Sequence, residues 1–181
     1  MSIAALPFEV GKSYAAADFP ELAQLVGQEF RSGLRTFRVC KAAAAIGASS
    51  AAALYAQGKA LKWSTQSSSA PSSSTVAGGS ATTSRICAVV PDDGPLAIAS
   101  GDIFLGQITG FNSAGKLGDQ SGDDVTAGDY IRCSGDADLG KIRTFSTDGE
   151  AIIEGVAFGR ALNSQTTDDG AIAFEILGRL T

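Results

Sequence analysis

The sequence predicts a mainly β protein: a small β-barrel or β-sandwich of short strands with tight Gly-Asp turns, an extended N-terminal arm and one short helix. Three observations lead to this fold class. The second half of the chain repeats short apolar runs, rich in β-branched residues and too short for ordinary helices. Turn sequences such as Ala99-Ser100-Gly101-Asp102 and Ala127-Gly128-Asp129-Tyr130 precede new runs. The chain also holds 22 glycines, which suits a protein with many tight turns.

The length and composition indicate a single core. A chain of 181 residues with 44% hydrophobic content can bury one good core. We therefore expect an arm and short helix over residues 1–29, then one β-rich domain over residues 30–181. The Ser-rich segment 67–84 has too little apolar area to offset its ordering entropy, which predicts a mobile loop or an extended crossover. A linker between two domains is the alternative, and it is disfavoured because residues 1–66 hold few strong apolar runs.

The N-terminal segment divides into an arm and a helix start. Residues Met1–Val10 are mostly apolar and contain Pro7, which favours an extended arm that either frays or adds to the sheet edge of a neighbour. The sequence Asp18-Phe-Pro-Glu21 indicates a helix start, with Asp18 as the N-cap. No signal-peptide pattern and no apolar run of membrane-spanning length is present, so we expect a soluble protein without a membrane partner.

A basic segment follows at Phe30–Lys41. Its Thr-Phe-Arg-Val alternation and Gly33 favour a strand over a helix. Two interpretations of its charges remain open: a solvated edge that discourages strand aggregation, or a patch that contacts a partner. The cations concerned are Arg31, Arg35, Arg38 and Lys41.

The rest of the chain is predicted to form short strands joined by turns and loops. The alanine-rich stretch Ala42–Ala56 is interrupted by Gly47-Ala48-Ser49-Ser50 and is predicted to form turns and short strands. A Gly/Asp/Ser loop is predicted over Phe111–Thr126. The predicted strands are Ala60–Trp63, Ile86–Val90, Ile103–Ile108, Tyr130–Cys133, Lys141–Phe145, Ala151–Leu162 and Ile172–Leu180.

Composition argues against several classes of function. The chain has no histidine, which removes the commonest general base and the commonest metal ligand. Cys40, Cys87 and Cys133 lie far apart and are odd in number, so we expect buried thiols and no disulfide framework. Residues 1–90 carry a formal charge of +4 and residues 91–181 one of −9. An acidic protein of this kind is a poor nucleic-acid binder, whereas two-signed surfaces suit docking on protein.

Two segments carry residue types of a ligand site without the spacing that such a site needs. The sequence Gly110–Leu117 is close to a phosphate-binding loop, but Leu117 stands where the motif needs Ser or Thr and no helix follows, so a hairpin loop is predicted. Asp119, Asp123, Asp124 and Asp129 could supply calcium ligands, but their spacing fits no EF-hand, so they are read as solvated turn residues. The pairs Asp92-Asp93 and Asp168-Asp169 are read in the same way.

A series of short motifs runs through most of residues 30–181. The segments are Val39–Ile46 (VCKAAAAI), Ala97–Gly110 (AIASGDIFLGQITG), Val125–Asp129 (VTAGD) and Ile153–Ala157 (IEGVA). The series resembles the capsid decoration proteins of tailed bacteriophages, also called cement or head-stabilising proteins. In that family a VKAAAAI strand, an A-x-A-x-G-D strand, a V-x-A-G-D turn and a V-x-G-V-A strand follow one another. The Ser-rich segment and the residues before Phe30 have no counterpart in the simplest family pattern.

The resemblance implies a β-barrel-like virion protein without enzymatic activity or cofactor. Such a protein binds the outer face of an assembled capsid and holds neighbouring major capsid protein subunits together. Self-association is also implied, with a homotrimer expected ahead of a homodimer. We expect the arm and the basic segment to contact the capsid through Leu6, Phe8, Arg31, Arg35, Arg38 and Lys41. The alternatives are a carbohydrate-binding or fibre-type module that uses the Ser/Gly/Asp loops, and an enzyme based on the Gly110–Leu117 sequence.

Overall fold

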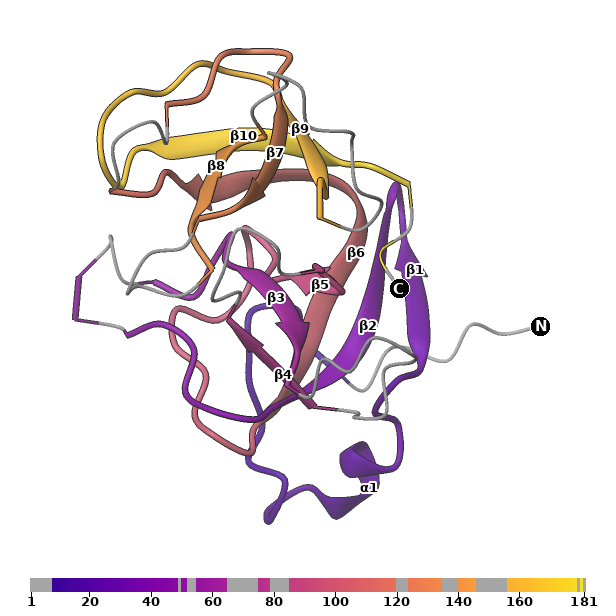
Figure 1. The fold of residues 1–181 in the computed structure, drawn as a ribbon. Coiled ribbons are helices and arrows are strands. Elements are labelled where there is room, and N and C mark those ends of the chain that lie inside the picture. Colours follow the sequence, from indigo (N-terminus) through magenta and orange to yellow (C-terminus); the bar gives the residue numbers. More distant parts are fainter. Residues whose placement is uncertain are drawn as a thin grey trace.

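The computed structural model describes residues 8–48, 50–51, 55–64, 75–78, 85–119, 124–134, 140–145, 156–178 and 180. This part of the chain is mainly β, as predicted, with one four-residue helix and ten strands in one hydrogen-bonded sheet (Figure 1). The elements are α1 (Pro20–Ala23), β1 (Glu29–Ser32), β2 (Arg35–Ala42), β3 (Ala60–Trp63), β4 (Thr75–Gly78), β5 (Ala88–Val89), β6 (Ile103–Lys116), β7 (Tyr130–Cys133), β8 (Ile142–Thr144), β9 (Gly159–Ala161) and β10 (Ala171–Ile176).

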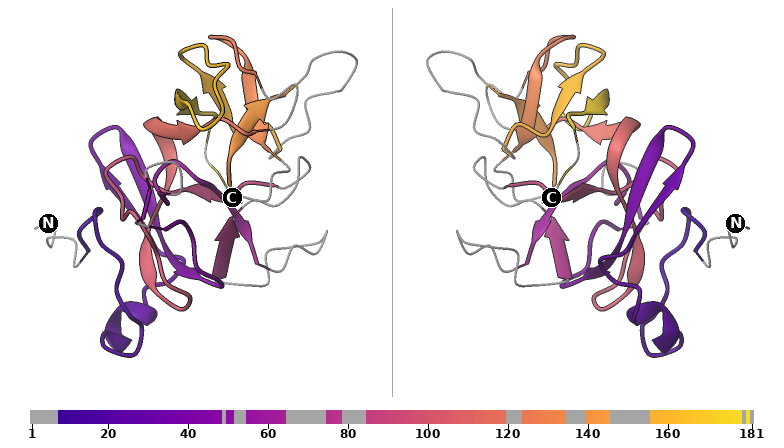
Figure 2. Two further views of the ribbon diagram at one scale, coloured as in Figure 1. Left: turned by 90° about the vertical axis from the view of Figure 1, so that its left-hand side faces the viewer. Right: turned by 90° about the vertical axis from the view of Figure 1, so that its right-hand side faces the viewer.

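The sheet closes on itself twice, which makes two small barrels. Strands β2, β4, β3, β5 and β6 form the first ring, because β2 pairs with β6 as well as with β4. Strands β6, β10, β9, β7 and β8 form the second ring, which a bridge between Leu117 and Ile142 closes. Figure 2 shows the second ring, in orange and yellow, stacked on the purple strands of the first. Closure of this kind leaves few strand edges open.

The long strand β6 belongs to both barrels. Residues 103–109 pair with β2, and residues 110–116 pair with β10. The sequence prediction of a strand at Ile103–Ile108 is confirmed, but the predicted loop from Phe111 is wrong as far as Lys116, and so is the hairpin loop at Gly110–Leu117. Glycine and polar residues suggested a turn there, yet the pairing with β10 keeps the segment extended.

Gly115 shows why this strand carries glycine. A side-chain carbon at this position would lie 2.7 Å from Ile142 Cδ1 and 2.8 Å from Phe174 Cε1. The interior of the second barrel is therefore already filled at this point of β6. Glycine in a strand often marks such a close approach and not a loop.

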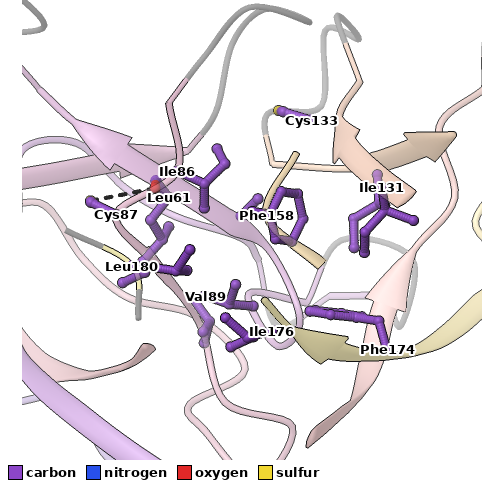
Figure 3. Close-up of a cluster of buried hydrophobic side chains, with 14 of the residues drawn as sticks. Leu61, Ile86, Cys87, Val89, Ile131, Cys133, Phe158, Phe174, Ile176 and Leu180 are labelled. Carbon is purple, nitrogen blue, oxygen red and sulfur yellow. Dashed lines mark hydrogen bonds between the residues drawn. The ribbon is translucent and has the colours of Figure 1, made fainter. Parts of the chain in front are cut away.

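One hydrophobic core runs through both barrels. Leu61 and Val89 of the first barrel belong to the same buried cluster as Ile131, Phe158 and Phe174 of the second (Figure 3). The rings of Phe158 and Phe174 meet edge to face, with centroids 5.7 Å apart. A shared core makes the described parts of the two barrels one packing unit.

The N-terminal segment packs on the outer face of the first barrel. Phe8 and Leu22 are buried against Phe37 of β2 and Leu105 of β6. The N-cap of α1 is Phe19 without a side-chain cap bond, so the prediction of Asp18 as N-cap is wrong. This short helix has no polar N-cap, so the packing of Leu22 stabilises it instead. Residues 1–7, which hold Leu6 and most of the predicted arm, lie outside the described residues.

Both Gly-Asp turns form as predicted. Gly101 and Gly128 have φ values of 87° and 98°, which L side chains rarely adopt. In each turn the aspartate accepts a hydrogen bond from the backbone nitrogen three residues earlier: Asp102 Oδ2 from Ala99 at 3.3 Å and Asp129 Oδ2 from Thr126 at 2.8 Å. The repeated sequence therefore encodes one repeated local structure.

Other predicted segments are confirmed or refined. Strands are found as predicted at Ala60–Trp63 and Tyr130–Cys133. The basic segment Phe30–Lys41 is not one strand but the hairpin of β1 and β2, which turns at Gly33 with φ 59°. Strand β4 lies inside the Ser-rich segment 67–84, and the rest of that segment lies outside the described residues.

Candidate functional site

The structure separates the residues predicted to contact a partner. Phe8 and Arg38 are buried, with 5% and 7% of their surface exposed, so neither offers a free surface on the described chain. Arg35 and Lys41 are half-buried, and Arg31 is exposed. Because strand neighbours point to opposite faces, the four cations of the hairpin do not form one patch.

Arg38 is a structural cation inside the first barrel. Its Nη2 donates to Glu29 Oε1 and to the Leu180 carbonyl, both at 2.9 Å, and its Nη1 donates to the Cys87 carbonyl at 3.2 Å. The guanidinium also lies 5.5 Å from the centre of the Trp63 ring. Arg38 thus links the hairpin, the residue before β5 and the C-terminal segment. Strand alternation places Arg35 and Arg38 on opposite faces of β2, but it does not say which of the two faces is buried.

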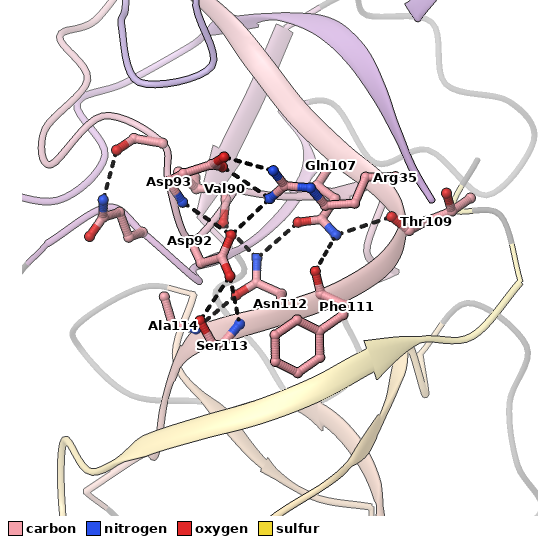
Figure 4. Close-up of polar contacts among 12 residues, drawn as sticks. Arg35, Val90, Asp92, Asp93, Gln107, Thr109, Phe111, Asn112, Ser113 and Ala114 are labelled. Carbon is pink, nitrogen blue, oxygen red and sulfur yellow. Dashed lines mark hydrogen bonds and ion pairs between the residues drawn. The ribbon is translucent and has the colours of Figure 1, made fainter. Parts of the chain in front are cut away.

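Arg35 reaches in the other direction, to the pair Asp92-Asp93. Its Nη1 lies 2.8 Å from Asp92 Oδ1, and its Nη2 lies 2.6 Å from Asp93 Oδ2. The hydrogen bonds that Arg35 donates to Asp93 raise the pKa of Arg35 above its ordinary value. Asp92 Oδ2 also accepts from the backbone nitrogen and the hydroxyl of Ser113 (Figure 4). These aspartates are therefore bound by protein groups, and the prediction of solvated turn residues is incomplete.

A buried amide pair lies where β6 passes from one barrel to the other. Gln107 Nε2 donates to the carbonyl oxygens of Thr109 at 3.0 Å and Phe111 at 2.8 Å. Asn112 Nδ2 donates to Gln107 Oε1 at 3.2 Å and to the Val90 carbonyl at 3.1 Å. Both side chains are fully buried, so these bonds satisfy polar groups that no water reaches. Sequence reasoning missed this network, because a lone Gln and Asn in an apolar run carry no motif.

The Arg35 cluster borders an open depression on the surface. The depression has a volume of about 500 Å³. At its edge stand two exposed apolar side chains, Leu34 at the tip of the β1–β2 hairpin (88% exposed) and Phe111 on β6 (48% exposed). We call this area the Leu34 surface, formed by Leu34, Arg35, Asp92, Asp93, Phe111 and Ser113. Two apolar side chains beside an internally paired charge cluster are suited to a protein contact.

Other candidate sites find no support in the described part of the chain. There, no group of three or more His, Cys, Asp and Glu side chains could hold a metal ion. Two of the proposed calcium ligands have protein partners: Asp119 lies 3.8 Å from Lys141 Nζ, and Asp129 accepts from its own turn. Asp169 lies 2.8 Å from Lys141 Nζ, while Asp123 is outside the described residues. Nor does any helix of the described residues reach the length and hydropathy needed to span a membrane.

The three cysteines are free and buried, as the sequence predicted. Burial raises the pKa of the Cys40 thiol to about 12 and raises that of Cys87 as well. The thiolate is the nucleophilic form, so both thiols are held in the unreactive form at neutral pH.

These pKa shifts predict a loss of stability at alkaline pH. The folded state holds both protons more tightly than the unfolded chain, whose thiols ionise near pH ~8.5. Their stabilising effect is complete below that pH and declines above it, by about 1.4 kcal/mol per thiol and pH unit. Urea unfolding between neutral and alkaline pH should show this decline. In the double variant Cys40→Ala/Cys87→Ala, the free energy of unfolding should fall less steeply with pH than in the wild-type chain. Equal slopes in the variant and the wild-type chain would contradict the prediction.

Comparison of the chain with protein-family models, with curated proteins and with solved structures finds no match in any of the three. The fold defines a mainly β protein of two small barrels that share one strand, and the Leu34 surface carries two exposed apolar side chains beside a paired charge cluster.

Proposed function

We propose that this protein is a capsid decoration protein, which binds the outer face of an assembled bacteriophage capsid and stabilises contacts between major capsid protein subunits. The observation that carries the proposal is where the family-like motifs lie in the fold. Val39–Ile46 covers the second half of β2, and Ala97–Gly110 covers a Gly-Asp turn and the start of β6. Val125–Asp129 forms the turn before β7. Three of the four motifs thus lie on strands and turns of the two barrels, and most of Ile153–Ala157 lies outside the described residues.

The architecture suits a cement role. A protein that holds neighbouring subunits together needs a compact body that keeps its shape under load, and the two fused barrels share one core. Many identical copies on a symmetric lattice convert modest single contacts into a large collective stabilisation. The protein would be made in the host cytoplasm and act at the surface of the virion, without a catalytic step or a cofactor.

The alternative function, a carbohydrate-binding module, has one observation in its favour. Phe111 exposes part of its ring beside Asp92 and Asp93, an arrangement that could receive a sugar. However, the oxygens of both carboxylates already accept hydrogen bonds from Arg35 or Ser113. Few acceptors remain to orient sugar hydroxyls, so the arrangement fits a protein contact better than a glycan contact.

The test is direct binding to shells. Phage capsids assembled without this protein are incubated with the purified chain and sedimented. We expect saturable co-sedimentation at a fixed number of copies per shell, and shells that resist heating or denaturant better once occupied. Shells already saturated with the protein are the control and should take up no more. Absence of co-sedimentation would overturn the proposal, and saturable binding on a glycan array would favour the alternative.

A further inference from the structure

We infer that residues 8–26 form a strap that closes over an apolar face of the first barrel and opens at Gly27 while both barrels stay folded. We call these residues the strap and the face that they cover the strap face. The strap face is formed by Phe37 and Val39 of β2 and by Ile103 and Leu105 of β6. The inference concerns a movement within one chain, so it does not depend on the capsid function.

The strap face lies on the outside of the first barrel. Strand neighbours point to opposite faces, and Cys40 of β2 and Phe104 of β6 point into the core that the barrels share. The four residues of the strap face point the other way, yet each is at most 1% exposed, because the strap packs on them. Opening of the strap therefore exposes four large apolar side chains on one sheet face, a kind of surface that soluble proteins ordinarily keep covered.

The apolar contacts beneath the strap form a cluster of their own. Phe8 and Leu22 of the strap are buried in this cluster, and Val10 and Tyr14 pack at its border. None of the described residues belongs both to this cluster and to the shared core. In Figure 1, α1 of the strap lies at the end of the molecule away from β7, β9 and β10. The strap can therefore detach while the shared core stays packed, which is what local unfolding requires.

Few polar contacts attach the strap to the first barrel. Tyr14 N donates to the Ile103 carbonyl at 2.9 Å, and Ile103 N donates to the Tyr14 carbonyl at 2.8 Å. Among the described residues, this is the one position where the backbone of the strap bonds to a barrel. Ser13 Oγ adds a hydrogen bond of 2.7 Å to Asp102 Oδ2. The other backbone hydrogen bonds of the described strap stay within the N-terminal segment, so they need not break when the strap opens.

Gly27 marks the place where the strap ends and the sheet begins. It has φ 89°, and nothing lies within 4 Å of a side-chain carbon placed there, so no neighbouring group restricts a turn of the chain. From this residue on, the chain is bound to β2: Gly27 N donates to the Val39 carbonyl at 2.8 Å, and Val39 N donates to the Gln28 carbonyl at 2.9 Å. The hinge is therefore at the boundary between a weakly attached segment and a paired strand.

Native-state hydrogen exchange of the purified full-length chain, followed residue by residue by NMR, tests the inference. The amides of Tyr14 and Ile103 should exchange at least about tenfold faster than the amides of β10, because their opening does not require the barrels to unfold. Ile172→Val truncates a buried side chain of the second barrel and should speed the exchange of the β10 amides about two- to tenfold. In the same variant, the Tyr14 and Ile103 amides should keep their wild-type exchange rates.

A second variant tests the attachment of the strap. Ser13→Ala removes the bond to Asp102 and should speed the exchange of the Tyr14 and Ile103 amides about two- to tenfold. The matched control is Ser100→Ala, which removes a hydroxyl of the same Gly-Asp turn that donates to the Ala43 carbonyl and not to the strap. The control should leave the exchange of both amides unchanged.

Each result decides the question, and circular dichroism establishes that the variants remain folded. The inference is overturned if the Tyr14 and Ile103 amides exchange as slowly as those of β10, or if Ile172→Val speeds both groups equally. It is also overturned if the two amides show no protection, because the strap would then not be closed, or if Ser13→Ala behaves like Ser100→Ala. None of these results depends on whether the protein binds capsids, so the strap and the proposed function can fail separately.

Discussion

Replacing Gly58 with alanine is expected to prevent folding or to lower the free energy of unfolding by more than about 4 kcal/mol. Gly58 has φ 74°, and a side-chain carbon there would overlap the carbonyl group of Ala114 in β6. The obstacle is backbone, not the end of a flexible side chain. That part of β6 cannot easily move away, because Gly115 is paired with Ile172 of β10. Urea unfolding monitored by circular dichroism measures the loss.

Gly101→Ala is the matched control for this variant. Gly101 also has a positive φ, 87°, but nothing lies within 4 Å of a side-chain carbon placed there. Its replacement should lower the free energy of unfolding by about 1–2 kcal/mol, which is the cost of holding a side-chain-bearing residue in the left-handed conformation. The difference between the losses of unfolding free energy in the two variants therefore measures the steric cost that arises because the loop before β3 lies so close to β6. Equal losses would show that this approach is not as tight as described.

Arg38→Met should lower the free energy of unfolding by about 3–5 kcal/mol. Methionine keeps much of the apolar stem but donates no hydrogen bond. The carbonyl oxygens of Cys87 and Leu180 lose their donor in a buried setting, and Glu29 loses its bond to the guanidinium. The loss should appear in urea unfolding as a shifted midpoint.

The comparison variant is Arg35→Met. Arg35 makes two ion pairs, but its side chain is 29% exposed and water can replace its contacts. A loss of about 1 kcal/mol is expected from such a site. If Arg35→Met proved as damaging as Arg38→Met, the burial of Arg38 would not be the source of its effect. The pair also tests the separation of the hairpin cations that strand alternation produces.

Local chemistry explains the parts of the fold that were predictable. The turns at Gly101 and Gly128 depend on one residue that tolerates positive φ and one aspartate that bonds three residues back. Both requirements lie within four consecutive residues, so the sequence alone reveals them. Short strands such as Tyr130–Cys133, which follows directly on a Gly-Asp turn, were predictable for the same reason.

The candidate surface was predictable only in part. Arg35 was singled out from the sequence and lines the Leu34 surface, whereas Arg31 is not among the residues that form it. Leu34 and Phe111 were not singled out, because one exposed leucine and one exposed phenylalanine look like ordinary core residues in a sequence. Phe8 and Arg38 were expected to face a partner and are buried instead. Exposure depends on what the rest of the chain covers, and no local pattern states it.

By itself, the sequence determined the β class, the Gly-Asp turns, most strand positions and the burial of the cysteines. Each of these follows from periodicity or from the conformational preference of a few adjacent residues. Only the tertiary structure decided that β6 continues to Lys116 and serves two barrels, that β2 closes the first ring, and that Arg38 points inward while Arg35 reaches Asp92. Those features depend on partners far away in the chain, and pairing with a distant strand can override the local preference of glycine and polar residues for a turn.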